Sequence, residues 1–138
     1  MKKLSTRNEW YIPHYRYLEL KYYCLQYPIW ESAYNSIDSM VTSNPEKLTM
    51  FEHPGSVSKP VERAIDTCLA LKKRMDMIHD AVFEACDGKE ALANRLLDAV
   101  VHDKSYDTLQ ANDTMPVSRG EYYNAYHRFF WILSKSRN

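Results

Sequence analysis

Apolar residues recur at intervals of three and four along most of this chain, which is the spacing of an amphipathic α-helix. Pro13 and Pro28 mark the starts of two aromatic-rich helices, because proline is tolerated in the first turn of a helix. A long helix is expected over residues 60–86, and Asp87 and Gly88 form a stop signal directly after it. The pattern therefore predicts three helices in the first two thirds of the chain.

A fourth helix is predicted at residues 91–101, and two further helices are predicted after it. Ser105 is positioned to cap a short helix that continues to Ala111, since a serine side chain accepts hydrogen bonds from the first N–H groups of a helix. Ser118 and Glu121 form a capping box at the start of the last helix. The short helix, the linker and the longer helix together predict a helix-turn-helix-like unit.

This order of elements predicts an all-α fold, a single-domain bundle of five or six helices. A chain of 138 residues has about the length of one domain. Three glycines and six prolines disfavour an all-β fold, which needs many turns. Within residues 1–138 we expect an aromatic helical hairpin at 1–41, an irregular loop at 42–59, a helical core at 60–104 and the helix-turn-helix-like unit at 105–138.

The same spacing selects the side of each helix that should face the core. In the first helix, one side carries Leu18, Tyr22 and Leu25. In the long helix, the expected inward residues include Ile65, Leu69, Met75, Ile78, Ala81, Val82 and Ala85. In the last helix, an apolar stripe is formed by Tyr122, Tyr126, Phe129 and Leu133, with Phe130 beside it.

The opposite side of the last helix carries polar residues with the chemistry of a DNA reader. Asparagine can pair with adenine and arginine with guanine, while Tyr, Arg and Lys side chains can hold phosphates. The predicted DNA-binding residues are Asn124, His127, Arg128 and Lys135 on this side, with Arg119 and Tyr123 toward its flanks. A solvent-exposed helix that merely carries polar residues is the alternative. Trp131 on this side is typical of packing against the N-terminal aromatic helices or a second subunit.

The charge balance limits the kind of partner. Eighteen basic and eighteen acidic residues give a formal net charge of zero, which counts against simple non-specific binding to nucleic acid. Cys24, Cys68 and Cys86 are widely spaced, so neither a disulfide framework nor a zinc knuckle is expected. No signal peptide and no apolar run near 18 residues is found. We therefore expect a cytoplasmic protein without a membrane partner.

No pattern of a catalytic or metal site is present in the sequence. The five histidines do not have the spacing of zinc ligands, and neither a glycine-rich phosphate loop nor a G-x-S-x-G motif occurs. We expect a protein that is not an enzyme and that has no catalytic residues, no metal and no cofactor.

The C-terminal part of the chain resembles a known family. The pattern Ser-Tyr-x-x-Leu, a linker, and then Val-Ser-Arg-x-x-Tyr-Tyr-x-x-Tyr-x-x-Phe-Phe-x-x-Leu-x-Lys is similar to the end of small phage transcription regulators of the RinA and ArpU type. The likeness extends from Leu92 to the C-terminus, and the residues that match in character are Ser118, Tyr122, Tyr123, Arg128 and Leu133. It implies a DNA-reading helix-turn-helix like that at the end of sigma factors.

Two functions follow as hypotheses. The first is a phage- or mobile-element-type transcription regulator that binds duplex DNA through its last helix. Such a neutral subunit would gain from forming a homodimer, because two half-sites share the phosphate contacts. The alternative is a small helical protein-binding module, such as a phage-encoded inhibitor or adaptor of a host protein. The eleven tyrosines and three tryptophans support this alternative, since such aromatic residues are favoured at interfaces.

Overall fold

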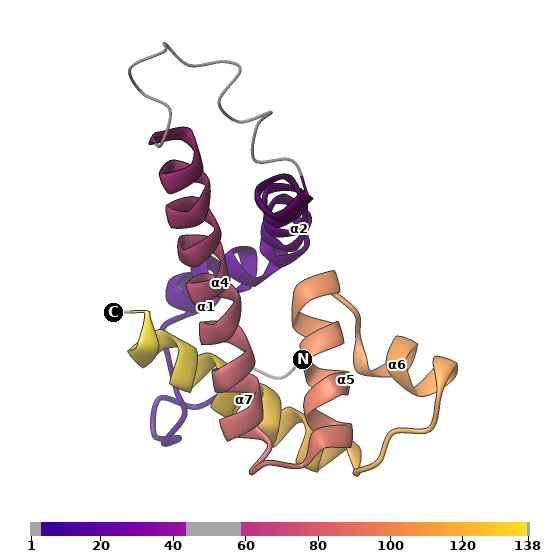
Figure 1. The fold of residues 1–138 in the computed structure, drawn as a ribbon. Helices are drawn as coiled ribbons and strands as arrows, with labels where there is room; N and C mark the ends of the chain where they lie inside the picture. The colour runs from indigo at the N-terminus through magenta and orange to yellow at the C-terminus, as the bar shows by residue number, and fades with distance from the viewer. Residues whose placement is uncertain (1–3, 44–58, 138) are drawn as a thin grey trace. The chain divides into compact units, whose positions relative to one another are not determined.

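The structure is a computed structural model that describes residues 4–43 and 59–137. In these two ranges every regular element is a helix, which confirms the all-α prediction (Figure 1). The helices are α1 (His14–Leu25), α2 (Tyr27–Ser43), α4 (Lys59–Ala85), α5 (Glu90–His102), α6 (Tyr106–Asn112) and α7 (Arg119–Ser136). Of the expected irregular loop at 42–59, residues 44–58 lie outside the described residues, while 42–43 end α2 and 59 begins α4.

The chain divides into two compact units, and the first contains the whole predicted DNA-binding face. The first unit comprises Met1–Tyr27 and Met77–Asn138, so it holds α1, α5, α6, α7 and the last turns of α4. The second unit is Pro28–Asp76 and holds most of α2 and of α4. Within the second unit, the guanidinium of Arg74 lies 5.7 Å from the ring centre of Trp30.

Local hydrogen bonds explain where the helices of the first unit begin and end. The Ser105 side chain accepts from the Thr108 N–H at 3.2 Å, and the Ser118 side chain accepts from the Glu121 N–H at 3.2 Å. Both caps satisfy backbone donors that would otherwise lack a partner inside the helix. After α4, Gly88 adopts a φ of +76°, and its N–H donates to the Phe83 carbonyl at 3.0 Å. The two serine caps and the predicted stop signal are therefore confirmed; of the predicted capping box, the structure shows the hydrogen bond from the Glu121 N–H to Ser118.

The core of the first unit is formed around one side of α7. Tyr122, Phe129, Phe130 and Leu133 are buried there, as the spacing predicts, and Ala125 and Ile132 are buried with them. Helices α1, α5 and α7 contact one another, and α6 contacts α5. Tyr126 is half-buried, and its hydroxyl forms a 2.7 Å hydrogen bond with the hydroxyl of Tyr17 in α1. Burial raises the pKa of both Tyr122 and Tyr126, so these phenols stay neutral.

The prediction is wrong for three residues that were expected to face the core, Tyr22, Ile65 and Leu69. Tyr22 is 61% exposed, and α1 buries Leu20, Tyr23 and Cys24 instead. Ile65 and Leu69 are also exposed. They lie in the part of α4 that belongs to the second unit, where α2 is the only other described helix available to cover them. Spacing identifies an amphipathic helix, but the partner decides which side is buried.

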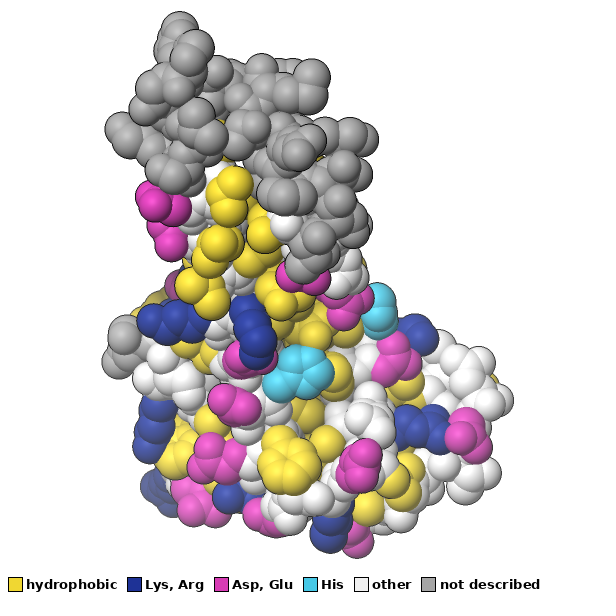
Figure 2. Space-filling model, in the orientation of Figure 1, with side chains coloured by type: hydrophobic (Ala, Val, Ile, Leu, Met, Phe, Trp, Pro, Cys, Tyr) yellow, Lys and Arg dark blue, Asp and Glu magenta, His cyan; other side chains and the backbone are white. Residues whose placement is uncertain are grey.

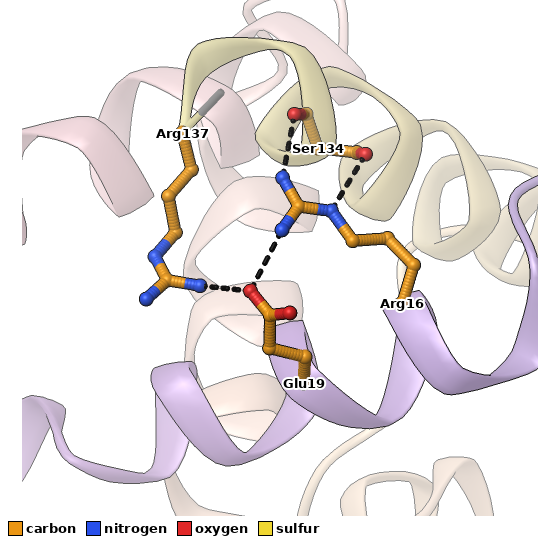
Figure 3. Close-up of polar contacts among 4 residues, drawn as sticks. All are labelled: Arg16, Glu19, Ser134 and Arg137. Atoms are coloured by element: carbon orange, nitrogen blue, oxygen red, sulfur yellow. Dashed lines mark hydrogen bonds and ion pairs between the residues drawn. The ribbon is translucent and has the colours of Figure 1, made fainter.

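A polar cluster holds α1 against the C-terminal end of α7 (Figure 3). Arg16 donates to the Ser134 hydroxyl at 3.1 Å and to the Ser134 carbonyl at 2.9 Å, and it pairs with Glu19 at 2.7 Å. The same carboxylate of Glu19 accepts from Arg137. Arg16 thus satisfies a carbonyl in the last turn of α7, where backbone acceptors lack partners within the helix. The cluster fixes the end of α7 that lies farthest from Ser118.

We expect Ser118→Ala to lower the free energy of unfolding by about 1 kcal/mol, because the Glu121 N–H loses its acceptor. Urea unfolding followed by circular dichroism measures the change. Ser118→Asp is the matched control, since a carboxylate can accept the same hydrogen bond and should retain most of the stability. An alanine variant as stable as the unmodified chain would show that the cap does not contribute.

Candidate nucleic-acid interface

Four of the six predicted DNA-binding residues, Asn124, His127, Arg128 and Lys135, lie on the side of α7 away from the buried stripe, whereas Arg119 and Tyr123 lie at its flank. We call these six residues together the outer face of α7. Three of them, Arg119, Asn124 and Lys135, are exposed, and the other three are half-buried. Because successive residues turn by about 100°, Arg119 and Arg128, nine residues apart, point in nearly opposite directions from the helix axis. The outer face is therefore a row along α7 that winds from the flank of the buried stripe to its far side, and its members have different surroundings.

Arg119 stands at the start of the row and is held by its neighbours. Its side chain is 60% exposed, and Nη1 donates to Asp107 Oδ1 at 3.1 Å. Its guanidinium lies 5.3 Å from the ring centre of Tyr106 and 5.5 Å from that of Tyr123. Both distances are those of cation–π contacts. Arg119 is thus an exposed cation with a defined orientation.

Tyr123 belongs to a tyrosine cluster at the junction of α6 and α7. Its ring centre lies 5.1 Å from that of Tyr122, 6.0 Å from Tyr126 and 6.2 Å from Tyr106. These edge-on and tilted arrangements are the favoured geometries of aromatic pairs. The ring of Tyr123 is therefore fixed by packing, and the cluster joins the outer face to the core.

Arg128 pairs with an aspartate from another element. Asp87, just beyond the end of α4, accepts from Arg128 Nη1 at 2.7 Å. Asp87 has a left-handed backbone with a φ of +53°, which is uncommon for a residue other than glycine. The hydrogen bond and the charge of Arg128 lower the pKa of the Asp87 carboxyl below its ordinary value. The positive charge of Arg128 is thus largely matched within the chain.

His127 faces a hollow of about 520 Å³, which is lined mainly by aromatic side chains from the N-terminal arm, α1 and α7. Trp10, His14, Tyr17 and Phe130 are among the lining residues. Burial lowers the pKa of the His127 imidazole below 6.5, so the side chain is neutral at pH 7. His127 can therefore donate or accept a hydrogen bond there, but it does not supply positive charge to a phosphate.

Lys135 and Trp131 cover each other near the end of α7. The ammonium nitrogen of Lys135 lies 3.4 Å from the ring centre of Trp131, and Trp131 is half-buried. The position of Trp131 in the middle of a polar side is therefore explained by contact with a cation on the next turn. Together with the fixed ring of Tyr123, this contact leaves no large open aromatic patch along the outer face.

Positive and negative charges are balanced around the outer face. Arg119 and Arg128 are paired with carboxylates, and the exposed Glu121 adds another negative charge near the start of α7. Figure 2 shows Lys and Arg side chains interspersed with Asp and Glu side chains, without a broad basic patch on the side drawn. The chemistry that the outer face offers is a set of oriented hydrogen-bond donors rather than a strong positive field.

Two carboxylate partners of the outer face, Asp87 and Asp107, are not predicted from the sequence. Asp107 lies 12 residues before Arg119, and Asp87 lies 41 residues before Arg128. Their positions in the sequence mark only a helix stop and the first turn of a short helix. No spacing rule connects them to the outer face, since the fold brings these residues together.

Comparisons with known proteins yield no match: no family model, no curated protein and no solved structure matches the chain. In the described part of the chain, no group of three or more His, Cys, Asp or Glu side chains could hold a metal ion. Over the same residues, no helix combines the length and the apolar character needed to cross a membrane.

We expect the Asp87 carboxyl to titrate below pH 3.8, and Arg128→Gln to raise its pKa towards that ordinary value. Because the folded pKa is lowered, the stabilisation from this pair is present above about pH 3.8 and is lost as the pH falls through the folded pKa. Carboxyl-detected NMR measures the titration. Arg119→Gln is the control and should leave Asp87 unchanged; equal Asp87 pKa values with and without Arg128 would contradict the assignment.

Proposed function

We propose that this protein is a transcription regulator of the phage or mobile-element type, which binds duplex DNA through the N-terminal half of α7. The observation that carries the proposal is the exposure of Arg119 and Asn124 at the capped start of a helix whose apolar side is buried in the core. A helix anchored in this way presents its polar side chains to a partner without rearranging. The sequence resemblance of the chain from Leu92 to the C-terminus to small phage regulators supports the same proposal.

The chemistry of the two exposed residues is that of base recognition in the major groove. An arginine can donate two hydrogen bonds to guanine, and an asparagine can pair with adenine. In helix-turn-helix proteins the first turns of the second helix contact the base edges. Arg119 and Asn124 occupy the first two turns of α7, which follows the short helix α6.

The balanced charge predicts modest and salt-sensitive affinity. The aspartates of the Arg119–Asp107 and Arg128–Asp87 pairs are largely exposed to solvent. Exposed ion pairs contribute only about 0–1 kcal/mol to the free energy of folding. DNA can therefore engage either arginine at small cost to its ion pair. A homodimer would double the number of phosphate contacts, which compensates for the zero net charge of each chain.

The same face bears on the protein-binding alternative. A protein interface is usually centred on aromatic anchors that enter a partner's pocket. Here Trp131 is covered by Lys135, and Tyr123 is packed between Tyr106, Tyr122 and Tyr126. These contacts favour DNA as the partner of the outer face.

We expect the full-length chain to bind mixed-sequence duplex DNA at about 50 mM salt, with an affinity that falls steeply as the salt concentration rises, because counterions compete for the phosphates. The double variant Arg128→Ala with Asn124→Ala should weaken binding by about tenfold or more, since it removes a phosphate or base contact at each position. Fluorescence anisotropy with a labelled duplex measures both effects.

The control is Lys73→Ala with Asn94→Ala, which likewise removes one cation and one asparagine, here from exposed positions outside α7. This control should bind DNA like the unmodified chain, and circular dichroism should show that all three proteins are folded. If the unmodified chain shows no binding at about 50 mM salt, the proposal is wrong. Equal losses in the two double variants would also contradict it.

A further inference from the structure

Arg119 is the most completely oriented cation on the outer face. Tyr106 and Asp107 from α6 and Tyr123 from α7 surround its guanidinium, at 5.3 Å and 5.5 Å for the two ring centres and 3.1 Å for the carboxylate. A long arginine side chain otherwise loses much conformational freedom when it binds a ligand. Because these three contacts restrict it beforehand, less freedom is lost on binding.

The remaining hydrogen-bond donors of Arg119 suit a neutral planar acceptor. A guanidinium carries five N–H donors in a rigid fork, and the Asp107 carboxylate accepts from one nitrogen, Nη1. The side chain is 60% exposed, so the rest of the fork is accessible. The O6 and N7 atoms of guanine form the acceptor pair that such a fork recognises in the major groove.

Asp107 disfavours the other acceptor that DNA offers, the phosphate group. Its carboxylate lies within 3.1 Å of Arg119 Nη1, so a phosphate on the same guanidinium would approach a second negative charge closely. Like charges at such distances repel, and a base edge carries no net charge. The ion pair therefore shifts the preference of Arg119 from the DNA backbone towards a base.

We infer that Arg119 recognises a guanine base in the duplex and that Asp107 is the positioning residue that directs it to this base. The inference rests on the proposed DNA-binding function and adds the identity of one recognised base. Asp107 itself is not expected to contact DNA. Its effect is on the sequence preference of binding and not on the fold.

The test begins with selection of preferred sequences from a random duplex pool by the full-length chain. Replacing the selected guanine–cytosine pair by adenine–thymine should lower the affinity about tenfold for the unmodified chain. Arg119→Lys should largely lose this discrimination, because an ammonium group cannot form the two-pronged contact. Asp107→Asn should also reduce the discrimination, while its affinity for random duplex should rise.

Two controls separate positioning from charge. Asp107→Glu keeps the carboxylate and should restore most of the discrimination. Asp113→Asn removes a negative charge from the same region, where Asp113 pairs with Arg95 instead of Arg119. That variant should leave the discrimination at the guanine unchanged.

The outcomes separate the inference about Arg119 from the proposed DNA-binding function. Discrimination that persists unchanged in Arg119→Lys, or in Asp107→Asn, overturns the inference and leaves the proposed function standing. The same holds if the chain binds DNA without selecting any guanine, or if Asp107→Asn and Asp113→Asn have identical effects. Absence of any duplex binding by the unmodified chain overturns both.

Discussion

Burial of the aromatic side of α7 is the constraint on which the rest of the first unit depends. Tyr122, Phe129 and Leu133 are almost completely buried. The helix that carries them, α7, contacts α1 and α5. Each buried side chain of this size contributes about 1.5–3 kcal/mol relative to exposure. Successive residues of α7 are about 100° apart around its axis. Burial of the aromatic side therefore also fixes the directions in which the other side chains of α7 point. The outer face is thus a consequence of the core.

The elements around α7 determine how its outer face behaves. The end of α4 brings Asp87 to Arg128, and the first turn of α6 brings Asp107 to Arg119. Both arginines therefore keep their geometry while much of their charge is matched. A DNA-binding surface of this kind depends more on oriented hydrogen bonds than on long-range attraction. The zero net charge of the chain and its proposed function are compatible on this basis.

The sequence predicts features that depend on neighbouring residues. The caps at Ser105 and Ser118 and the end of α4 at Asp87 and Gly88 were predictable because each depends on a few adjacent positions. The buried stripe of α7 was predictable because one side of this helix is clearly more apolar than the other. These local signals are sufficient for the all-α fold and for the outer face.

Features that depend on distant residues could not be predicted in this way. The aspartate partners of Arg119 and Arg128, and the burial that lowers the pKa of His127, require the packed structure. The exposure of Tyr22 and Leu69 has the same origin, since spacing alone does not reveal which neighbour covers a helix. Predictions from spacing therefore succeed for the helices and fail for charge pairing and for part of the burial.

The most direct test of the central claim is an NMR titration of isotope-labelled full-length chain with duplex DNA at low salt. The account predicts that the Asn124 side-chain amide and the Arg119 Nε–H resonances shift, together with backbone amides in the first two turns of α7. Resonances of α2 should stay in place. Unchanged resonances at Arg119 and Asn124, or shifts confined to α2, would contradict the claim that α7 is the DNA-binding helix.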